Sequence, residues 1–375
     1  MPKETCLHRL LVILPTLNGG GAEKATLTLI GGLNPEEFQV TLFVVKTQGA
    51  YWSEIPTGVK VETAIAAGKR ILPCLPRILS RLATLAREAD LVVGGQELTA
   101  TYLALTAAKV ARRPVVGIIH TDLEQFLPTS SRFDPILLRL LYPMLDRNIA
   151  VSRGTASALC RLVPQMEGRT IVLGNPLDLG LIKQRSVEGA PADAPRRYIL
   201  GMGRLSQEKG FDLLLRAYGI LVREGIEQDL VILGEGPERQ LLLSLAKTLG
   251  IADRVHLPGF AANPYGWLKT AELFVLPSRF EGFGLVLVEV MAVGTPVVAV
   301  DALGGGPREI LADGDCGTLV PRGDVDALAR EMRRLLDNSD LAEDFVRRGQ
   351  IQSQNYDVSV VIPAYEKLFK QVIPW

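Results

Sequence analysis

Residues 276–289 read LPSRFEGFGLVLVE and combine three local signals. The apolar run that ends before Pro277 is typical of a buried strand, and the glycines after it are typical of a loop. A helix is predicted from Leu285 to Val293, where Gly294 ends it. A buried strand that passes directly into a helix is half of a βαβ unit, so this segment predicts an α/β fold with a parallel sheet.

The same alternation continues along nearly the whole chain. Predicted strands form a first series at 10–14, 40–45, 91–93, 115–119 and 148–151 and a second at 198–200, 230–233, 255–257, 273–276, 297–300 and 317–320. The turn signal Gly174-Asn175-Pro176 separates the two series. The sequence therefore predicts two Rossmann-like, doubly wound α/β domains that face each other across a cleft, with ligands bound at the carboxyl ends of their strands.

The composition limits the class of protein. The chain has 375 residues, 47% hydrophobic and 22% charged, which fits two folded domains and excludes a disordered or fibrous protein. Its 41 Lys and Arg residues balance 41 Asp and Glu residues, so no net charge attracts nucleic acid. The few cysteines and histidines disfavour a disulfide framework or a zinc site and indicate a reducing, cytoplasmic compartment. The four cysteines are Cys6, Cys74, Cys160 and Cys316.

The hydropathy pattern bears on membranes. The longest uninterrupted apolar run, residues 10–14, is too short for a signal peptide or a membrane span, so no segment is expected to cross a bilayer. The mean hydropathy of +0.21 is nevertheless somewhat high for a soluble enzyme. Peripheral contact with the inner face of the cytoplasmic membrane therefore stays open.

Two glutamates, Glu281 and Glu289, flank the start of the predicted helix 285–293. Unpaired N–H groups at a helix start favour an anion, and carboxylates beside them can accept hydrogen bonds from sugar hydroxyls. One site could thus hold a phosphate and two sugars. The alternative is that Glu289 caps or salt-bridges its own helix and that Glu281 is a solvated loop residue.

The loop 201–210 follows the first strand of the second series and carries Arg204 and Lys209. A planar guanidinium and a compact ammonium group together suit a diphosphate. A dinucleotide-binding fingerprint is rejected because Ser206 stands where the third glycine belongs, and no P-loop sequence occurs. Two cations and two acids are therefore predicted to face one cleft.

The first domain offers two further candidates. Asn18-Gly-Gly-Gly-Ala-Glu23 joins its first strand to its first helix, where glycines let the backbone approach a ligand or simply form a flexible turn. His120 ends the strand 115–119, where an imidazole can hydrogen-bond a sugar or act as a base. A buried structural histidine is an equal alternative.

Together these residues resemble the retaining family 4 glycosyltransferases of the GT-B fold, which transfer sugars from nucleotide diphosphates. The motifs that carry the resemblance extend over nearly the whole chain. They are the glutamate-x7-glutamate motif (Glu281 to Glu289), the Arg204/Lys209 pair, the Gly-Gly-Ala-Glu loop, Gly174-Asn175-Pro176 and Gly234-Glu-Gly-Pro237. The resemblance implies that Arg204 and Lys209 neutralise the donor diphosphate, that Glu289 binds the ribose and that Glu281 binds the donor sugar. It places His120 beside that sugar and the acceptor.

The resemblance also implies a division of labour. An N-terminal acceptor domain is expected at 1–177, completed by a C-terminal helix within 358–375, and a nucleotide-sugar donor domain at 178–357. The family's last helix crosses back to the first domain. Further nucleotide-binding positions are expected at Gly20, Gly21, Gly234, Gly284 and Leu285, with the first two closing over the phosphates.

The expected function is transfer of a sugar, from UDP-hexose or UDP-N-acetylhexosamine, to a glycan or a polyprenyl-(pyro)phosphate-linked acceptor in bacterial polysaccharide or glycolipid synthesis. Two alternatives stay open: a nucleotide-sugar 2-epimerase, whose extra carboxylates would be Asp122 and Glu124, and a catalytically silent binding subunit. No metal or other cofactor is expected, because cationic side chains and a helix start neutralise the diphosphate. The Asp-x-Asp triplets at 313–315 and 324–326 fit a turn and a helix cap instead.

Two segments bear on the acceptor. From Lys69 to Arg87 there are five basic residues and no acidic one, with Pro76 predicted in the first helical turn. This helix either packs on the sheet with a solvated basic face or lies on a membrane and engages a lipid-linked phosphate. The segment Pro135 to Leu145 is apolar on most sides and is predicted to be buried between the sheet and a neighbour.

Overall fold

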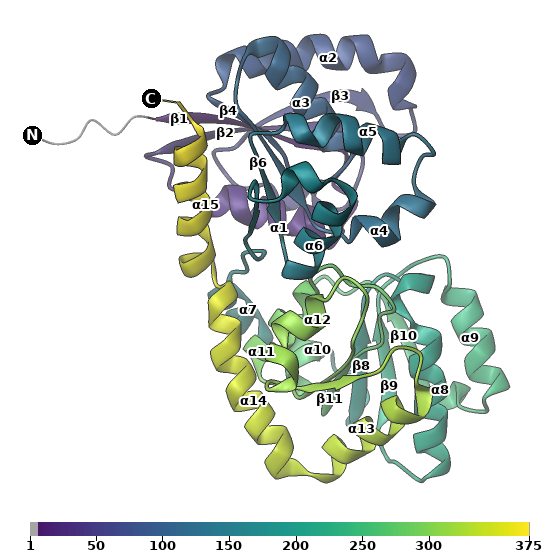
Figure 1. The fold of residues 1–375 in the computed structure, drawn as a ribbon. Helices are drawn as coiled ribbons and strands as arrows, with labels where there is room; N and C mark the ends of the chain where they lie inside the picture. The colour runs from purple at the N-terminus through teal and green to yellow at the C-terminus, as the bar shows by residue number, and fades with distance from the viewer. Residues whose placement is uncertain (1–6, 375) are drawn as a thin grey trace, which may run out of the picture. The chain divides into compact units, whose positions relative to one another are not determined.

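The computed structural model describes residues 7–374, so Cys6 lies outside the described residues. The chain divides into two compact units (Figure 1). Unit 1 comprises the chain up to Leu177 together with the segment from Val358, and unit 2 comprises Asp178–Asp357. Each unit is a parallel sheet flanked by helices, so the predicted architecture of two Rossmann-like domains is confirmed.

The sheet of unit 1 has seven strands in the order β3-β2-β1-β4-β5-β6-β7. Adjacent strands are parallel, and β1 pairs with both β2 and β4. The strand order reverses between β1 and β4, so a ligand crevice is expected at their carboxyl ends. The strands are β1 (His8–Leu14), β2 (Phe38–Thr47), β3 (Lys60–Ala66), β4 (Leu91–Gly94), β5 (Val115–Ile119), β6 (Arg147–Ala150) and β7 (Thr170–Val172).

Seven α-helices accompany this sheet in the described chain. One core cluster joins a face of the sheet to α2, α3, α5 and α6, through buried residues such as Ile78, Leu103 and Leu138. These helices therefore cover the same side of the sheet (Figure 1). The helices are α1 (Gly21–Gly32), α2 (Ile71–Glu88), α3 (Thr99–Ala111), α4 (Leu123–Phe126), α5 (Asp134–Leu141), α6 (Arg153–Leu162) and α15 (Val358–Val372).

The last helix, α15, belongs to unit 1 although unit 2 precedes it in the chain. Gly32 at the end of α1 has no room for a Cβ atom, which would lie 2.9 Å from the Ile362 side chain. The carboxylate of Glu366 accepts a hydrogen bond from the Asn34 backbone at 2.7 Å, and Lys370 pairs with Glu37 at 2.7 Å. Close packing and polar contacts thus fix α15 against α1.

The sheet of unit 2 has six strands in the order β10-β9-β8-β11-β12-β13. Its strand order reverses between β8 and β11, which are parallel neighbours. The second expected crevice therefore lies at the carboxyl ends of these two strands. The strands are β8 (Tyr198–Met202), β9 (Asp229–Leu233), β10 (Val255–Gly259), β11 (Leu273–Leu276), β12 (Val297–Val300) and β13 (Thr318–Val320).

The helices of unit 2 include α11, whose residues are apolar on nearly every side and buried from Leu287 to Val293. Such a helix can only lie inside the unit, where it contacts α7, α10 and α14. The helices are α7 (Leu179–Ser186), α8 (Phe211–Arg223), α9 (Arg239–Thr248), α10 (Tyr265–Thr270), α11 (Leu285–Val293), α12 (Gly306–Ile310), α13 (Val325–Asp337) and α14 (Ser339–Ser353).

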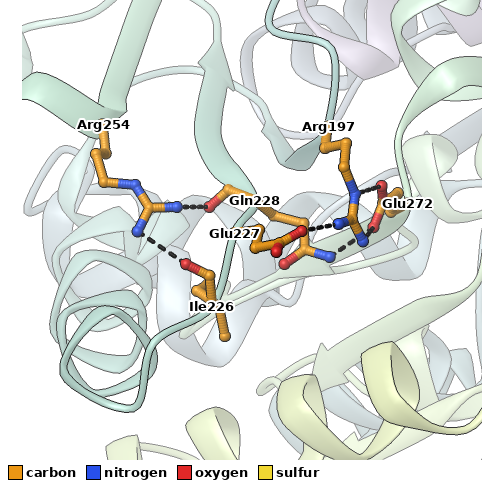
Figure 2. Close-up of polar contacts among 6 residues, drawn as sticks. All are labelled: Arg197, Ile226, Glu227, Gln228, Arg254 and Glu272. Atoms are coloured by element: carbon orange, nitrogen blue, oxygen red, sulfur yellow. Dashed lines mark hydrogen bonds and ion pairs between the residues drawn. The ribbon is translucent and has the colours of Figure 1, made fainter.

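A polar network closes the amino-terminal edge of this sheet (Figure 2). Arg197, before β8, donates to the Glu272 carboxylate before β11 at 2.7 Å and also pairs with Glu227. Arg254, before β10, donates to the backbone oxygen of Gln228 at 2.8 Å and to that of Ile226 at 2.9 Å. These contacts join the loops that precede four strands. They leave the opposite, carboxyl edge for a ligand.

Three sequence predictions differ from the structure in unit 1. The edge strands β3 and β7 were not predicted, because β3 alternates with polar residues and β7 is only Thr170–Val172. The segment Pro135 to Leu145 is not buried as predicted: its helix turns Leu138 inward and leaves Ile136 and Leu140 exposed. Pro76 lies inside α2 rather than in its first turn.

Candidate active site

In unit 2, the loops that follow β8 and β11 meet at the reversal of strand order. Lys209 Nζ donates to Glu281 Oε2 at 2.6 Å, and both side chains are largely buried. Gly210 adopts a left-handed backbone with φ of +66°, and a Cβ atom there would lie 2.2 Å from the Pro277 oxygen. Only glycine therefore allows the loops to approach so closely, and their approach brings the Lys209 ammonium to the Glu281 carboxylate.

A second ion pair fixes the loop after β11. The guanidinium of Arg279 contacts both carboxylate oxygens of Asp212 on α8 at 2.7 Å. Burial disfavours the charged form of Asp212, but this bidentate contact outweighs it and holds the pKa of Asp212 below its ordinary value. Arg279 also donates to the Gln207 backbone oxygen at 2.9 Å. Arg279 is thus a structural residue that positions the loop carrying Glu281.

The main chain of Glu281 is held from the other side as well. Its N–H donates to the Leu303 oxygen at 2.8 Å, and its own carbonyl accepts from the Gly306 N–H at 3.3 Å. A Cβ atom on Gly306 would lie 2.2 Å from the Phe283 oxygen, so this segment also requires glycine. These contacts fix the Glu281 backbone, and its side chain retains 13% exposure.

Helix α11 begins beside this loop. Its N-cap is Gly284, with a left-handed φ of +95°, and its first residue, Leu285, is half-buried. Glu289 lies one turn into the helix and is only 3% exposed. The structure therefore places Glu281 and Glu289 on either side of a helix start, as the sequence suggested.

Arg204 lies in the loop after β8, close to the glycine-rich loop after β9. A Cβ atom on Gly234 would lie 1.9 Å from the Gly203 oxygen, and one on Gly236 would lie 2.2 Å from the Leu205 oxygen. These contacts fix the backbone on both sides of Arg204. Its side chain is exposed and forms no ion pair with any residue in the described part of the chain. The guanidinium is therefore available to an anionic ligand.

A pocket at the carboxyl ends of β9 and β10 extends this region and was not predicted. It is lined by the loop 188–193, by Gly259 and Phe260, and by Trp267. The Asn263 side chain closes one side by donating to Glu188 at 2.7 Å. Phe260 is exposed and offers an aromatic surface. The only sequence signal for this pocket was Phe260, an aromatic residue that lies shortly after a predicted strand and directly after a glycine.

In unit 1, the first turn of α1 contains Glu23, the last residue of the glycine-rich motif, to which the sequence pattern assigned no role of its own. Gly20 is the N-cap of α1, and a Cβ atom there would lie 2.6 Å from Glu23 Oε2. Glu23 is buried, which raises its pKa, and it accepts hydrogen bonds from backbone N–H groups that include that of Gly20. The carboxylate thus lies at the helix start, beside Gly20 and Gly21.

His120 follows β5 and is held by two neighbouring loops. Its Nε2 atom lies 3.1 Å from the Gly95 oxygen, which can only accept, so Nε2 carries the proton and Nδ1 is an acceptor. Its backbone N–H donates to the buried carboxylate of Glu97 at 2.9 Å. Burial lowers the pKa of His120 to about 4, so the ring is neutral at pH 7.

The acceptor atom of His120 has no hydrogen-bond partner of good geometry among the described residues, although the Asn175 side chain lies beside the ring. Nδ1 is buried and forms no hydrogen bond with the described residues, and the same is true of Oδ1 of Asn175. An unsatisfied buried acceptor costs free energy unless a ligand or water donates to it. His120 Nδ1 and Asn175 Oδ1 are therefore two atoms of unit 1 that could accept a hydrogen bond from a ligand hydroxyl. Glu97 was not predicted, because nothing in the sequence pattern distinguishes it, and Asn175 was named only as part of the Gly174-Asn175-Pro176 turn.

The acids considered for epimerase catalysis or for metal binding form local structural contacts. Asp122 caps α4 by accepting from the Glu124 N–H at 2.9 Å, and Glu124 pairs with Arg161 at 2.6 Å. Asp324 caps α13, and Asp313 lies in a turn beside Arg308. Within residues 7–374, no three His, Cys, Asp or Glu side chains gather as a metal site would require.

Helix α2 packs on the core with an exposed basic face, as the first of its two interpretations predicted. Its apolar face, including Ile78, Leu82 and Leu85, is buried in the core. Its basic residues are exposed, but Arg81 is paired with Glu62 at 2.8 Å, whereas Arg77 forms no ion pair within the described chain. No helix of residues 7–374 has the length and apolarity needed to cross a bilayer.

Two doubly wound parallel units, each with candidate ligand groups at its reversal of strand order, define the class of GT-B glycosyltransferases. The family described as Glycosyltransferase Family 4 matches residues 19–181, and that described as Glycosyl transferases group 1 matches residues 183–352. The chain therefore belongs to the family 4 glycosyltransferases, and the predicted family is confirmed.

Individual relatives agree with this assignment. A phosphatidyl-myo-inositol mannosyltransferase of Mycobacterium leprae is 31% identical over 74% of this chain and 72% of its own. The N-acetylgalactosamine-N,N'-diacetylbacillosaminyl-diphospho-undecaprenol 4-alpha-N-acetylgalactosaminyltransferase of Campylobacter jejuni is 28% identical over 94% of this chain and 96% of its own. In fold, the chain resembles HepE of Anabaena, crystallised with UDP and glucose, with a TM-score of 0.83, 23% identity and coverage of 97% and 100%.

Proposed function

We propose that this glycosyltransferase moves a hexose or N-acetylhexosamine from UDP to a lipid-linked glycan, with retention of anomeric configuration. The observation that carries the donor half of this proposal is the Lys209–Glu281 pair beside the exposed Arg204, at the β8/β11 reversal. The acceptor half is supported by two relatives whose names state an undecaprenol-linked and a phosphatidylinositol acceptor.

Unit 2 binds the donor in this proposal. Arg204 and Lys209 contact the diphosphate, and the start of α11 after Gly284 adds N–H donors at Leu285. Glu281 exchanges its contact with Lys209 for one with the donor sugar, while Glu289 accepts from the ribose. The pocket lined by Leu233, next to Gly234, and by Phe260 receives the nucleotide base. UDP rather than GDP is proposed from the family resemblance alone.

The chemical step is a substitution at the anomeric carbon. The bond from that carbon to the diphosphate oxygen breaks, and its electron pair stays on the diphosphate. The acceptor hydroxyl attacks from the same face, and its proton passes to the departing phosphate oxygen. Arg204 and Lys209 stabilise the charge that develops on the leaving group, which is the main contribution asked of the protein.

Unit 1 binds the acceptor in this proposal. The neutral ring of His120 accepts a hydroxyl hydrogen at Nδ1, and the Gly20–Gly21 backbone approaches the ligand beside Glu23. No metal is needed, because cationic side chains and a helix start supply the positive charge. Activity should therefore persist in EDTA, and its abolition by EDTA with recovery on adding Mg²⁺ or Mn²⁺ would refute this part. The lipid acceptor implies action at the inner face of the cytoplasmic membrane.

The proposal is tested by incubating the protein with a panel of UDP- and GDP-sugars and a polyprenyl-diphosphate-linked glycan. Release of one nucleotide, together with a lipid product of increased mass, is expected. Nuclear magnetic resonance of the product should then show the anomeric configuration of the donor. An inverted linkage would contradict retention but leave the assignment of the donor residues intact.

A further inference from the structure

Large apolar side chains lie exposed around α5, where the sequence predicted burial. Among the described residues, six of the exposed large hydrophobic side chains fall in the short segment from 126 to 144, with exposures between 36% and 64%. We name this group the α5 patch. It consists of Phe126, Phe133, Ile136, Leu137, Leu140 and Met144.

The α5 patch is one face of an ordered helical segment. Phe133, Leu137, Leu140 and Met144 follow one another at intervals of four, three and four residues, which places them on one side of the helical turns. Between them, Leu138 and Tyr142 are buried and face the core. A contiguous exposed apolar face of this kind is uncommon on a monomeric protein and marks an interaction site.

Contacts with α3 hold this face outward. The hydroxyl of Tyr102 donates to the Asp134 oxygen at 3.3 Å, and the hydroxyl of Tyr142 accepts from the Leu98 N–H at 3.1 Å. The two tyrosine rings pack edge to face with centroids 6.2 Å apart. The helix therefore cannot rotate to bury its apolar face without breaking these contacts.

Two arginines lie within the segment that carries the α5 patch. The Arg132 guanidinium lies 4.8 Å from the centre of the Phe133 ring, and Arg139 projects from α5 itself. Neither forms an ion pair within the described chain. The acids in and just before this segment are engaged in local contacts: Asp122 caps α4, Glu124 is paired with Arg161 at 2.6 Å, and Asp134 accepts from the Ser131 N–H.

We propose that the α5 patch docks on an anionic lipid bilayer, with its apolar side chains in the headgroup region and the arginines against lipid phosphates. This proposal deepens, and rests on, the proposed function, because it assigns the surface by which the enzyme reaches a lipid-linked acceptor. Apolar side chains beside two arginines that have no ion-pair partner in the described chain match the chemistry of such a surface, and each basic group near it adds attraction. A second copy of this chain docked on the same patch would bring the same positively charged arginines together, so a dimer is the less favourable occupant.

The experiment compares the full-length double variant I136E/L140E with wild type in co-sedimentation with vesicles. The vesicles contain equal parts of phosphatidylglycerol and phosphatidylcholine, or phosphatidylcholine alone. L241E/I351E is the matched control, because it makes the same substitutions at equally exposed apolar positions on unit 2. Far-ultraviolet circular dichroism and Tm check folding, and I136S/L140S serves as a milder pair. Light scattering after gel filtration reports the oligomeric state.

We expect wild type and the control to bind the anionic vesicles, and I136E/L140E to bind at least about tenfold more weakly. Wild type that does not bind anionic vesicles, or an I136E/L140E variant that binds like wild type, would overturn the proposal. So would a wild-type dimer that this variant converts to a monomer. Transfer to a water-soluble acceptor should be unchanged in the variant. Failure of the proposed function would instead appear as absent transfer in protein that still binds vesicles.

Discussion

At the scale of single residues, Lys209 and Glu281 have to serve two states. Without a ligand, each neutralises the other at 2.6 Å. A bound sugar diphosphate offers Lys209 a charged phosphate and Glu281 a hydroxyl donor, so the pair can open while Lys209 stays paired and Glu281 stays hydrogen-bonded. Arg204 has no ion-pair partner within residues 7–374 to give up. The two cations therefore differ in their expected effect on folding, although both contact the diphosphate in our proposal.

We predict that Arg204→Ala and Lys209→Ala each lower turnover by about 10²-fold or more, because each removes a cation from the leaving diphosphate. Arg204→Ala should leave Tm unchanged, while Lys209→Ala should lower it slightly by leaving Glu281 unpaired. Steady-state kinetics and thermal melts measure the two effects. Arg216→Ala, which removes another exposed arginine of unit 2, is the control. Near wild-type turnover in both variants would remove these residues from the site.

The two glutamates should separate kinetically. Glu289→Gln is expected mainly to weaken binding of the nucleotide, because its proposed partner is the ribose. Glu281→Gln should instead lower turnover and sugar selectivity, because its proposed partner is the transferred sugar. Calorimetric titration with UDP and kinetics with several UDP-sugars distinguish the two outcomes. Identical behaviour of both variants would contradict the separate roles.

His120 makes stability depend on pH. Burial lowers its pKa from 6.5 to about 4, so between these values the unfolded chain binds a proton that the folded chain does not. Acidification from pH 7 to 4 should therefore remove about 3 kcal/mol of stability through this residue. Glu23 and Glu97, whose pKa values are raised by burial, act in the opposite direction.

The contribution of His120 must therefore be measured as a difference in unfolding free energy between wild type and a variant that lacks the imidazole. His120→Gln cannot titrate and keeps a donor within reach of the Gly95 oxygen. Denaturant unfolding of wild type and variant at several pH values gives the difference in the free energy of unfolding. That difference should shift against wild type as pH falls from 6.5 to 4. A constant difference across this range would show that His120 titrates normally.

At the scale of elements, burial explains which predictions succeeded. Strands buried on both faces, such as β5 and β11, form apolar runs, and the predicted and observed bounds coincide there. The edge strand β3 lacks this pattern because Lys60 and Glu62 face solvent and pair with each other and with Arg81. An apolar run does not reveal whether a neighbour covers it. That is why the segment 135–145 was wrongly predicted to be buried.

The site follows the same rule. The helix start at Gly284 and the glycine loop before α1 could be predicted from local sequence, because each is a turn signal beside an apolar run. The contact between Lys209 and Glu281 could not be predicted in this way. The two residues are far apart in sequence, and only the order of the strands brings them together. Glu97 likewise becomes notable only once the fold brings it near His120, and Asn175, known from sequence only as part of a turn, is brought beside the same ring.

Helix α2 gives a prediction of its own. Arg77→Glu with Arg81→Glu should reduce co-sedimentation with anionic vesicles and transfer to a lipid acceptor, while sparing UDP binding. Most of the loss should arise from Arg77, because Arg81 is already paired with Glu62. Arg216→Glu with Arg223→Glu on α8 makes the same change in charge and is the control. Equal vesicle binding by the double variant and wild type would leave α2 as an ordinary solvated helix.

At the scale of the whole molecule, the chain consists of two units with the same plan. Each is a parallel sheet whose order reverses once, between β1 and β4 in unit 1 and between β8 and β11 in unit 2. The candidate groups of each unit follow these strands or their neighbours at the carboxyl edge. In our proposal unit 2 holds a nucleotide sugar and unit 1 an acceptor, so donor turnover should depend on the acceptor.

That dependence gives the most direct measurement. Purified protein is incubated with each UDP-sugar in the presence and absence of bacterial lipid extract, and free UDP is quantified. We predict that one donor releases UDP rapidly only when lipid is present, with the sugar recovered in the lipid fraction. Conversion of the donor to its 2-epimer, or binding of UDP-sugars without any release in either condition, would contradict a lipid-directed glycosyltransferase.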